Sequence, residues 1–440
     1  MFQFNSGDMI VSPPRSDSSS PAPASSPSGF STPATSSSVL FDNAISNLSI
    51  LQGLLSDDQY VLVTGGLGYI GSHTTLELLK ANYNVIVIDN LSNAFESVVD
   101  RINLLAKQHH EKEGTPMPIF KYYCQDYQDT DALRSLLDEY KLPSRWGAPK
   151  SKIIGVIHFA AHKAVEESIR NPLKYYSNNV RGLIDFVGTL DEYGIKTFIF
   201  SSSATVYGTL ATSGSPLREE LCVHKTEVVE HPDGSRKTVQ PGSTGITNPY
   251  GRTKWMCEAI LSDLALSDPE WTIVALRYFN PIGCDSSGLL GEDPRGTPTN
   301  LLPVVVKVMT GQIPELRVFG TDWDTDDGTA VRDFIHVTDL AQGHIAALNA
   351  AVHGALRENF RTFNLGTGNG HSVMEVVETM EKATKKPIPR KAVDRRAGDV
   401  GYCVAAAGRS KDELQWTTHK TLTDACNDIC TFLKVSGHLG

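Results

Sequence analysis

The feature that most constrains this chain is a glycine-rich turn, T-G-G-L-G-Y-I-G at residues 64 to 71. The apolar run Y-V-L-V-T precedes it, and S-H-T-T-L-E-L-L-K, with the apolar spacing of a helix, follows it. Glycine at Gly65, Gly68 and Gly71 permits a tight turn, close approach of the backbone to a pyrophosphate, and tight packing of the helix on the strand. The turn therefore predicts a dinucleotide-binding site.

Short apolar runs recur along the chain and predict the rest of the fold. They are Y-V-L-V-T at residue 60, N-V-I-V-I-D at 84, I-I-G-V-I-H-F at 153, K-T-F-I-F-S-S at 196 and W-T-I-V-A-L-R at 271. Runs of this kind are typical of fully buried parallel strands, and helix-sized stretches separate them. We therefore expect an α/β fold, a Rossmann-type doubly wound parallel sheet with a smaller C-terminal substrate-binding subdomain.

The domain organisation follows from composition. Residues 1 to 56 are rich in Ser and Pro and are predicted to form a disordered tail. We expect a cofactor-binding Rossmann domain over residues 57 to 275 and a substrate-binding subdomain over residues 276 to 440, interleaved with the first. Two polar stretches, residues 104 to 117 and 222 to 246, are predicted to be surface loops.

Charge and cysteine content limit the classes of partner that we expect this chain to bind. The chain has 40 Lys and Arg against 50 Asp and Glu, a net charge of -10, which predicts no nucleic-acid partner. It has no apolar run long enough to span a bilayer and no signal-peptide pattern, so no membrane partner is expected. Seven cysteines without metal-ligand spacing predict no metal site and a reducing compartment, the cytoplasm.

A carboxylate after the second predicted strand indicates which dinucleotide binds. Asp89 ends that strand, where it can accept hydrogen bonds from the adenosine ribose hydroxyls. A carboxylate repels a 2′-phosphate, and no arginine follows at once in D-N-L-S-N. NAD is therefore favoured over NADP; the alternative is that Asp89 simply caps its strand.

A tyrosine–lysine pair supplies the candidate chemistry. In N-P-Y-G-R-T-K, Tyr250 and Lys254 stand four apart at the predicted start of a helix and project from one face. A nearby ammonium and the positive nicotinamide ring both favour the phenolate, so Tyr250 can take a proton from a substrate hydroxyl. The strand at residue 196 delivers Ser203 and Thr205 to the ligand-binding edge of the sheet, where Ser203 can stabilise charge on the reacting oxygen. For Ser201 and Ser202 the alternative is a serine-rich turn that satisfies its own backbone.

A series of motifs, in order, resembles a known family. They are T-G-G-x-G-Y-I-G-S-H-T, I-H-F-A-A-x-K-A-V-x-E-S, Y-Y-x-N-N-V, F-S-S-S-A-T-V-Y-G, P-Y-G-x-T-K, L-R-Y-F-N-P-I-G and V-R-D-F-I-H-V-x-D-L. Together they resemble the UDP-galactose (UDP-glucose) 4-epimerases of the extended short-chain dehydrogenase/reductase family. The resemblance covers residues 58 to 440.

The resemblance implies the remaining site residues. Besides the glycine loop and Asp89, the NAD site would be lined by Tyr69, Ile70, Asn90, Asp126, Tyr127, Phe159, Ala160, Lys163, Asn178, Lys254 and Tyr278. Besides Ser203, Thr205 and Tyr250, the UDP-sugar would be held by Asn280, Asn300, Leu301, Phe319, Arg332, Arg396 and Asp399. A guanidinium matches a diphosphate, which agrees with the two arginines.

The resemblance also implies the reaction and its range. Tyr250 would remove the 4-hydroxyl proton while a hydride passes to NAD, and the 4-keto sugar would turn over and be reduced on its other face. Cys403 occupies a pocket-wall position that is bulky in some members and small in others, so UDP-GlcNAc and UDP-GalNAc are expected as substrates too. A homodimer is expected from the family.

Two rival interpretations share the fold. A sugar-nucleotide dehydratase or decarboxylase would keep the cofactor loop and the Tyr–Lys pair, but a dehydratase would carry an acid pair after Thr205, where Val206 and Tyr207 stand here. A non-catalytic NAD-binding regulator would show a damaged pair or a broken glycine loop. Both are intact in this chain.

Overall fold

The computed structural model describes residues 59–143, 149–230, 234–296, 298, 300–396 and 398–438. The predicted tail, residues 1 to 56, lies outside this part of the chain.

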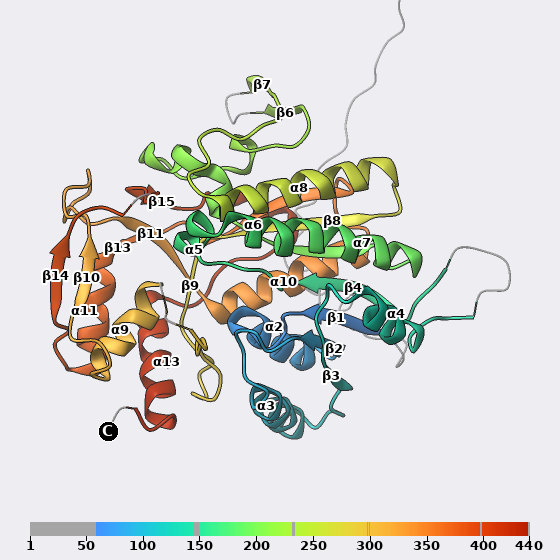
Figure 1. Ribbon diagram of the computed structural model, residues 1–440, viewed down its shortest axis with the longest axis horizontal. Coiled ribbons are helices and arrows are strands. Elements are labelled where there is room, and N and C mark those ends of the chain that lie inside the picture. The colour runs from blue at the N-terminus through green and yellow to red at the C-terminus, as the bar shows by residue number, and fades with distance from the viewer. Residues whose placement is uncertain are drawn as a thin grey trace, which may run out of the picture. The chain divides into compact units, whose positions relative to one another are not determined.

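A seven-stranded sheet forms the centre of the described structure (Figure 1), and every pairing within it is parallel. In spatial order its strands are β12 (Phe360–Leu365), β8 (Thr272–Tyr278), β5 (Thr197–Ser203), β4 (Ile153–His158), β1 (Tyr60–Thr64), β2 (Asn84–Asp89) and β3 (Phe120–Cys124). The five runs predicted from the sequence are confirmed as β1, β2, β4, β5 and β8. The strand order reverses at β1, between β2 and β4, which is where open α/β sheets bind ligands.

Helices cover both faces of this sheet, as a doubly wound fold requires (Figure 1). One face carries α2 (Tyr69–Lys80), α3 (Val98–Glu113) and α10 (Val337–Val352). The other carries α4 (Thr130–Asp138), α5 (Val165–Arg170), α6 (Pro172–Tyr175), the π-helix η1 (Tyr176–Arg181), α7 (Gly182–Glu192) and α8 (Pro249–Ser267).

The predicted surface loop at residues 104 to 117 is wrong for most of its length, because α3 extends to Glu113. Ile102, Leu105, Ala106 and His110 recur at helical spacing and are buried, while the polar residues form the exposed face. The helix ends at Gly114, whose left-handed φ of 68° suits glycine.

Smaller sheets and helices with a separate hydrophobic core form the substrate side. The strands are β9 (Asn280–Ile282), β10 (Leu316–Phe319), β11 (Val331–His336), β13 (Gly370–Ser372), β14 (Arg390–Val393) and β15 (Tyr402–Cys403). The helices are α9 (Leu301–Met309), α11 (Val373–Thr384) and α13 (Leu422–Val435), whereas α12 (Gly408–Leu414) packs against β12 and α10 of the large sheet. The proposed boundary at residues 275 and 276 falls inside β8, and α10 and β12, which follow it in sequence, join the large sheet.

The insertion at residues 222 to 246 is a surface loop only in part. Its middle is an exposed antiparallel hairpin of β6 (Glu227–Glu230) and β7 (Arg236–Val239), whose turn at residues 231 to 233 lies outside the described residues. Its first residues differ, because Cys222 and Val223 are buried. Short 3-10 helices, η2 (Ala204–Thr212) and η3 (Glu219–Leu221), lead from β5 to the insertion.

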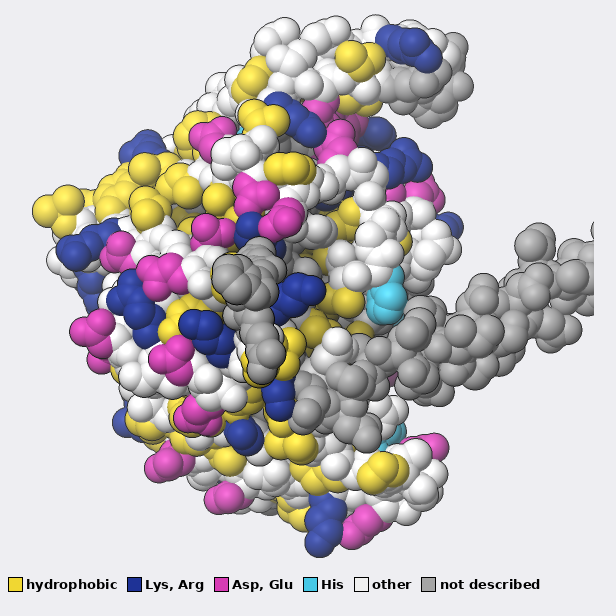
Figure 2. Space-filling model, turned by 90° about the vertical axis from the view of Figure 1, so that its right-hand side faces the viewer, with side chains coloured by type: hydrophobic (Ala, Val, Ile, Leu, Met, Phe, Trp, Pro, Cys, Tyr) yellow, Lys and Arg dark blue, Asp and Glu magenta, His cyan; other side chains and the backbone are white. Residues whose placement is uncertain are grey.

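Several large apolar side chains are exposed on α5, α6, α7 and α8. They are Ile169, Leu173, Ile184 and Leu266, of which Leu173 and Leu266 are 80% exposed. Figure 2 shows hydrophobic side chains gathered at its left edge, the side on which α7 and α8 lie. Among the described residues, no helix combines the length and the apolar character needed to cross a bilayer.

Candidate active site

The three loop glycines have different structural roles. Gly65 has φ +69°, and a Cβ there would lie 2.9 Å from the Ala160 nitrogen. A Cβ on Gly71 would lie 2.2 Å from the Gly65 carbonyl oxygen, so this glycine lets α2 pack against the turn. Gly68 differs, because a Cβ there would approach only the Gly65 oxygen, at 3.4 Å. Gly68 instead lines a cavity, where the absence of a side chain leaves its backbone accessible.

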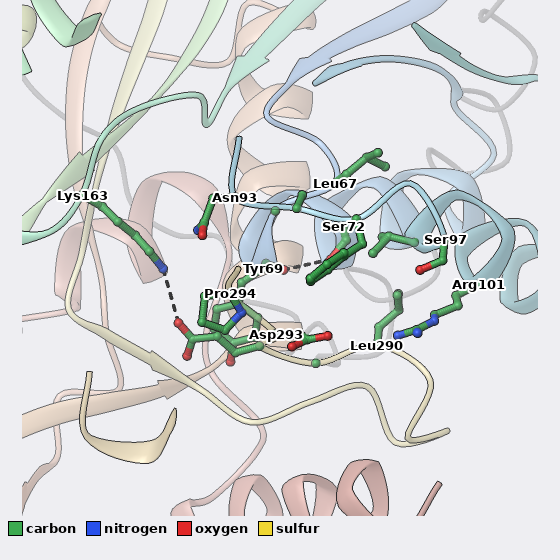
Figure 3. Close-up of a pocket in the computed structure, with 16 residues that line it drawn as sticks. Leu67, Tyr69, Ser72, Asn93, Ser97, Arg101, Lys163, Leu290, Asp293 and Pro294 are labelled. Atoms are coloured by element: carbon green, nitrogen blue, oxygen red, sulfur yellow. Dashed lines mark hydrogen bonds and ion pairs between the residues drawn. The ribbon is translucent and has the colours of Figure 1, made fainter. Parts of the chain in front are cut away.

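That cavity lies at the N-terminus of α2 (Figure 3). It is lined by the glycine loop, the start of α2, residues 93 to 98, and residues 290 to 294 from the substrate side. Arg101 and Lys163 are the cations among its lining residues. Figure 3 shows Lys163 reaching from the loop after β4 toward Glu292, to which its Nζ donates at 3.3 Å. A helix N-terminus, a bare glycine backbone and two cations fit the diphosphate of a dinucleotide.

The end of β2 provides the carboxylate predicted from the sequence. Asp89 is buried, and its two oxygens accept from the Leu67 N–H at 3.0 Å and the Leu91 N–H at 2.9 Å. Burial raises the pKa of this carboxyl, and the backbone hydrogen bonds oppose the rise. Asp89 therefore fixes the glycine loop to β2, and its carboxylate keeps acceptor capacity for a ribose hydroxyl.

The other residues predicted to line the NAD site have different surroundings in the structure. Asn90 Nδ2 donates to Asp126 at 2.9 Å, so these side chains lie together beyond the ends of β2 and β3. Tyr127 instead packs in the core, with its hydroxyl donating to the Asn178 carbonyl at 2.5 Å. The Tyr69 hydroxyl donates to the Gly283 carbonyl at 2.7 Å. The backbone groups of Tyr69 and Ile70 lie in the first turn of α2, at the helix N-terminus.

The predicted catalytic residues meet at the C-terminal end of β5. Asn248 caps α8 by accepting from the Gly251 N–H at 2.8 Å, and this places Tyr250 in the first turn of the helix. Ser203, the last residue of β5, is hydrogen-bonded to Tyr250 and accepts from the Thr205 hydroxyl at 3.0 Å. The Lys254 ammonium lies 6.0 Å from the centre of the Tyr250 ring.

Burial controls the protonation of this pair in the protein alone. It raises the pKa of Tyr250 to about 12, against the opposing hydrogen bond to Ser203. It lowers the pKa of Lys254 to about 8, against the attraction of Cys257 and Glu258. Burial therefore keeps Tyr250 protonated in the protein alone, so Tyr250 needs positive charge beside it in the site to act as a base.

Ser201 and Ser202 do not form the self-satisfied turn interpreted from the sequence. The Lys254 ammonium donates to the Ser201 carbonyl oxygen and, at 3.3 Å, to its hydroxyl. The Ser202 hydroxyl donates to buried Glu258 on α8. Both serines therefore join β5 to the helix that carries Tyr250.

The floor of the site is aromatic. The Tyr278 hydroxyl is hydrogen-bonded to His344 on α10, and the Phe159 ring lies 4.8 Å from the same imidazole. Phe159 is held at the end of β4 by the bond from its N–H to the Thr64 carbonyl, at 2.9 Å. Phe159 and Tyr278 therefore contact the same imidazole ring.

The predicted substrate residues gather on the substrate side. The Arg396 guanidinium lies 4.5 Å from the centre of the Phe319 ring and pairs with Asp399 at 3.0 Å. Arg332 Nη2 donates to the Val400 carbonyl at 2.6 Å, and Cys403 is the register partner of Arg332. These residues form one group on β10, β11 and the segment before β15.

Cys403 connects that group to the catalytic segment, because it is buried in a small cluster with Ala204 and Phe279. Asn280 begins β9, directly after this cluster. Asn300 and Leu301 stand further along, at the start of α9, where Asn300 Nδ2 donates to Glu292 at 3.4 Å. Glu292 therefore joins a predicted substrate residue to Lys163 of the cofactor pocket.

Sequence reasoning missed several residues of this site. Asn93 lines the cofactor cavity, His344 holds Tyr278, and Glu292 joins both sides of the site. Asn93 could have been found from its position four residues after Asp89. His344 and Glu292 carry no such signal, because only the fold brings them to the site.

Comparison with known proteins gives consistent results. The model of the NAD dependent epimerase/dehydratase family matches residues 61–366. The chain is 42% identical over 368 residues to the UDP-glucose 4-epimerase of Bacillus subtilis (strain 168), covering 84% of this chain and 95% of the relative. It is 42% identical over 374 residues to the bifunctional protein gal10 of Schizosaccharomyces pombe, covering 84% of this chain and 47% of that protein.

A solved structure is also similar. The UDP-glucose 4-epimerase from Bifidobacterium longum, in complex with NAD+ and UDP, superimposes with a TM-score of 0.71 at 39% identity. The alignment covers 86% of this chain and 99% of the other.

Proposed function

Because this chain belongs to the NAD-dependent epimerase/dehydratase family, we propose that it catalyses the reversible 4-epimerisation of UDP-glucose and UDP-galactose with NAD as its cofactor. One observation carries this proposal. Tyr250, Lys254 and Ser203 meet at the end of β5, within a sheet whose glycine loop and Asp89 suit a dinucleotide. Acid–base chemistry and a redox cofactor therefore share one site.

The chain's own residues have distinct roles in this reaction. The glycine loop and Asp89 would hold NAD, which would accept and return the hydride of the sugar carbon and supply positive charge to the site. Positive charge near Tyr250 would lower its pKa from the buried value, so Tyr250 could accept the 4-hydroxyl proton and later return it. Ser203 donates a hydrogen bond to the reacting oxygen, and Lys254, held by Ser201, orients the tyrosine and the cofactor ribose.

The diphosphate end of the substrate is assigned to the arginines. Arg332 and Arg396 carry permanent charge, and the Arg396 fork is occupied by Asp399 in the protein alone. We propose that a diphosphate takes the place of this carboxylate, which releases Asp399 to accept from a ribose hydroxyl. Such a clamp holds the nucleotide while the sugar turns over.

We further propose that N-acetylated sugars are substrates. Cys403 is small, and it is buried in the same cluster as Ala204 of the catalytic segment. A small side chain at that wall leaves room for an acetamido group on carbon 2 of the sugar.

The remaining proposals concern the whole protein. We propose a homodimer, for which Leu173, Ile184 and Leu266 supply exposed apolar surface on α6, α7 and α8. We propose a cytoplasmic location, because all seven cysteines, each among the described residues, are free thiols.

The test is to incubate the purified protein separately with UDP-galactose and UDP-GalNAc, without added cofactor, and to separate the nucleotide sugars by chromatography. Both should convert to their 4-epimers, and Tyr250→Phe should lower the rate by at least about 10²-fold because the acid–base group is lost. Conversion of UDP-galactose alone would remove the N-acetyl proposal. If neither sugar nucleotide is converted, even with added NAD, the proposed epimerase activity is rejected. The dehydratase and the non-catalytic regulator would then be the interpretations to test.

A further inference from the structure

A buried carboxylate ties together the elements that carry the catalytic residues. Glu258 lies one turn after Lys254 on α8, with its side chain fully buried. One oxygen accepts from the Ser202 hydroxyl and from Arg277 Nε, the latter at 3.0 Å. The other accepts from Arg277 Nη2 at 2.7 Å and is bonded to His224 Nε2 at 2.8 Å.

The partners of Glu258 are neighbours of site residues in sequence. Ser202 lies between Ser201, which holds Lys254, and Ser203. Arg277 precedes Tyr278 in β8. The carboxylate of Glu258 therefore sets the position of α8 against the ends of β5 and β8.

His224 comes from a different part of the chain, the insertion at residues 222 to 246. Its side chain is 3% exposed and packs between the rings of Trp255 on α8 and Phe360 on β12, at 5.7 and 5.8 Å. The insertion is anchored there, because Arg277 Nη2 also donates to the Cys222 carbonyl at 2.7 Å. The hairpin that follows is exposed, so the buried contact is confined to the first residues of the insertion.

The hydrogen bond between His224 and Glu258 has a definite direction. Burial raises the pKa of Glu258, but Arg277 and the hydrogen bonds from His224 and Arg277 outweigh it and hold the pKa well below its usual range. An ionised carboxylate can only accept, so His224 Nε2 is the donor. A buried ionic group needs all its hydrogen bonds, and loss of this one leaves that oxygen of Glu258 with Arg277 as its remaining partner.

We propose that His224 is a positioning residue for the catalytic helix, which it holds by donating to Glu258. The inference rests on the proposed epimerase function and assigns a role in it to the insertion. His224 touches neither Tyr250 nor Lys254 and acts through Glu258, Ser202 and Arg277. Without its donor, α8 shifts against β5, and the distance between Tyr250 and Ser203 is no longer held.

The test compares two variants of similar size, His224→Gln and His224→Met, in the full chain with its bound cofactor. The Gln amide can still donate to Glu258, whereas the Met thioether cannot. The Met variant should lose about tenfold in kcat for UDP-galactose with KM within about twofold, as expected for misplacement of catalytic groups. The Gln variant should stay within about twofold of wild-type kcat.

Val223→Ala is the matched control, because Val223 is the adjacent buried residue and makes no polar side-chain contact. Thermal stability and NAD content of every variant separate loss of fold from loss of positioning. Equal kcat in the Gln and Met variants, or an equal loss in Val223→Ala, overturns the proposal. A wild-type chain that does not epimerise UDP-galactose instead rejects the proposed function, and this inference with it.

Discussion

Lys254 combines a functional charge with an unfavourable place for it. Its side chain is buried, and burial lowers its pKa from the ordinary value of 10.5 to about 8. Between these two pH values the unfolded chain binds more protons than the folded one, so stability rises with pH across that window. Below about pH 8 the folded protein carries the full free-energy cost of burying the charged Lys254 ammonium.

Lys254→Met should therefore stabilise the protein at pH 7 while abolishing epimerisation. The gain is at most about 3 kcal/mol, since each pKa unit corresponds to about 1.4 kcal/mol, and the lost bonds to Ser201 offset part of it. Denaturant unfolding at pH 7 and pH 9 checks this, and the advantage should shrink at the higher pH. Lys107→Met, at an exposed lysine on α3, is the control. A Lys254→Met variant less stable than wild type at pH 7 would contradict the prediction.

Cys403 is the residue at which substrate range can be altered. Cys403→Tyr adds a ring at a position that is already buried, in a cluster that includes Phe279. We expect turnover of UDP-GalNAc to fall at least about tenfold relative to UDP-galactose, since pocket filling discriminates by this order. Cys403→Ser, which keeps the size, should leave the ratio of kcat/KM values unchanged. Full activity of the Tyr variant on UDP-GalNAc would contradict the proposal that Cys403 forms the pocket wall beside the N-acetyl group.

Individual residues were predictable from the sequence where a local motif carried them. Tyr250, Lys254, Ser203 and Asp89 stand in motifs whose spacing fixes their place on a helix start or strand end. The pKa of Tyr250 was not predictable in the same way. It depends on how much of the surrounding fold buries the phenol, and no spacing along the chain reports that.

At the scale of elements, a segment of the substrate side crosses the cofactor pocket. Residues 283 to 296, which we call the strap, follow β9. The Tyr69 hydroxyl donates to the Gly283 carbonyl at the start of the strap, and Lys163 pairs with Glu292 further along. Arg295 Nε donates to the Ala94 carbonyl at 2.7 Å. The strap is thus fixed to α2 and to the loops after β2 and β4.

These contacts predict that the strap retains NAD. Arg295→Ala removes the bond to Ala94 and the stacking of the guanidinium on Phe95, 4.6 Å from the ring centre. Loss of about 1 to 2 kcal/mol of closing energy should speed the loss of NAD by about tenfold. NAD remaining per protein after timed dialysis measures it, with exposed Arg317→Ala on β10 as the control. Equal retention in both variants would show that the strap does not close the pocket.

The elements differed in how far the sequence predicted them. Five buried strands read as apolar runs because both of their faces are covered. β3 was missed because it is an edge strand, F-K-Y-Y-C, with half-exposed residues and a mixed pattern. α3 was taken in part for a loop because its long polar face outweighs its narrow buried stripe.

At the scale of the molecule, the large sheet joins the two proposed domains. β8 pairs with β5 on one side and with β12 on the other, and β12 comes from the sequence range assigned to the substrate subdomain. The chain therefore returns to the sheet after building part of the substrate side, an interleaving that local patterns indicate poorly. Residues Ser56–Gly440 form one compact unit.

This continuity predicts that the unit unfolds in a single cooperative transition. Exposing β12 would leave one edge of β8 without its parallel partner, so neither proposed domain keeps a complete core when the other unfolds. Calorimetric and van't Hoff enthalpies of the NAD-stripped protein should agree. NAD at about 100 times its Kd should add about 2.7 kcal/mol and move the whole transition upward without splitting it. Two transitions, of which NAD shifts only one, would instead mean that residues 57 to 275 and 276 to 440 unfold independently despite the shared sheet.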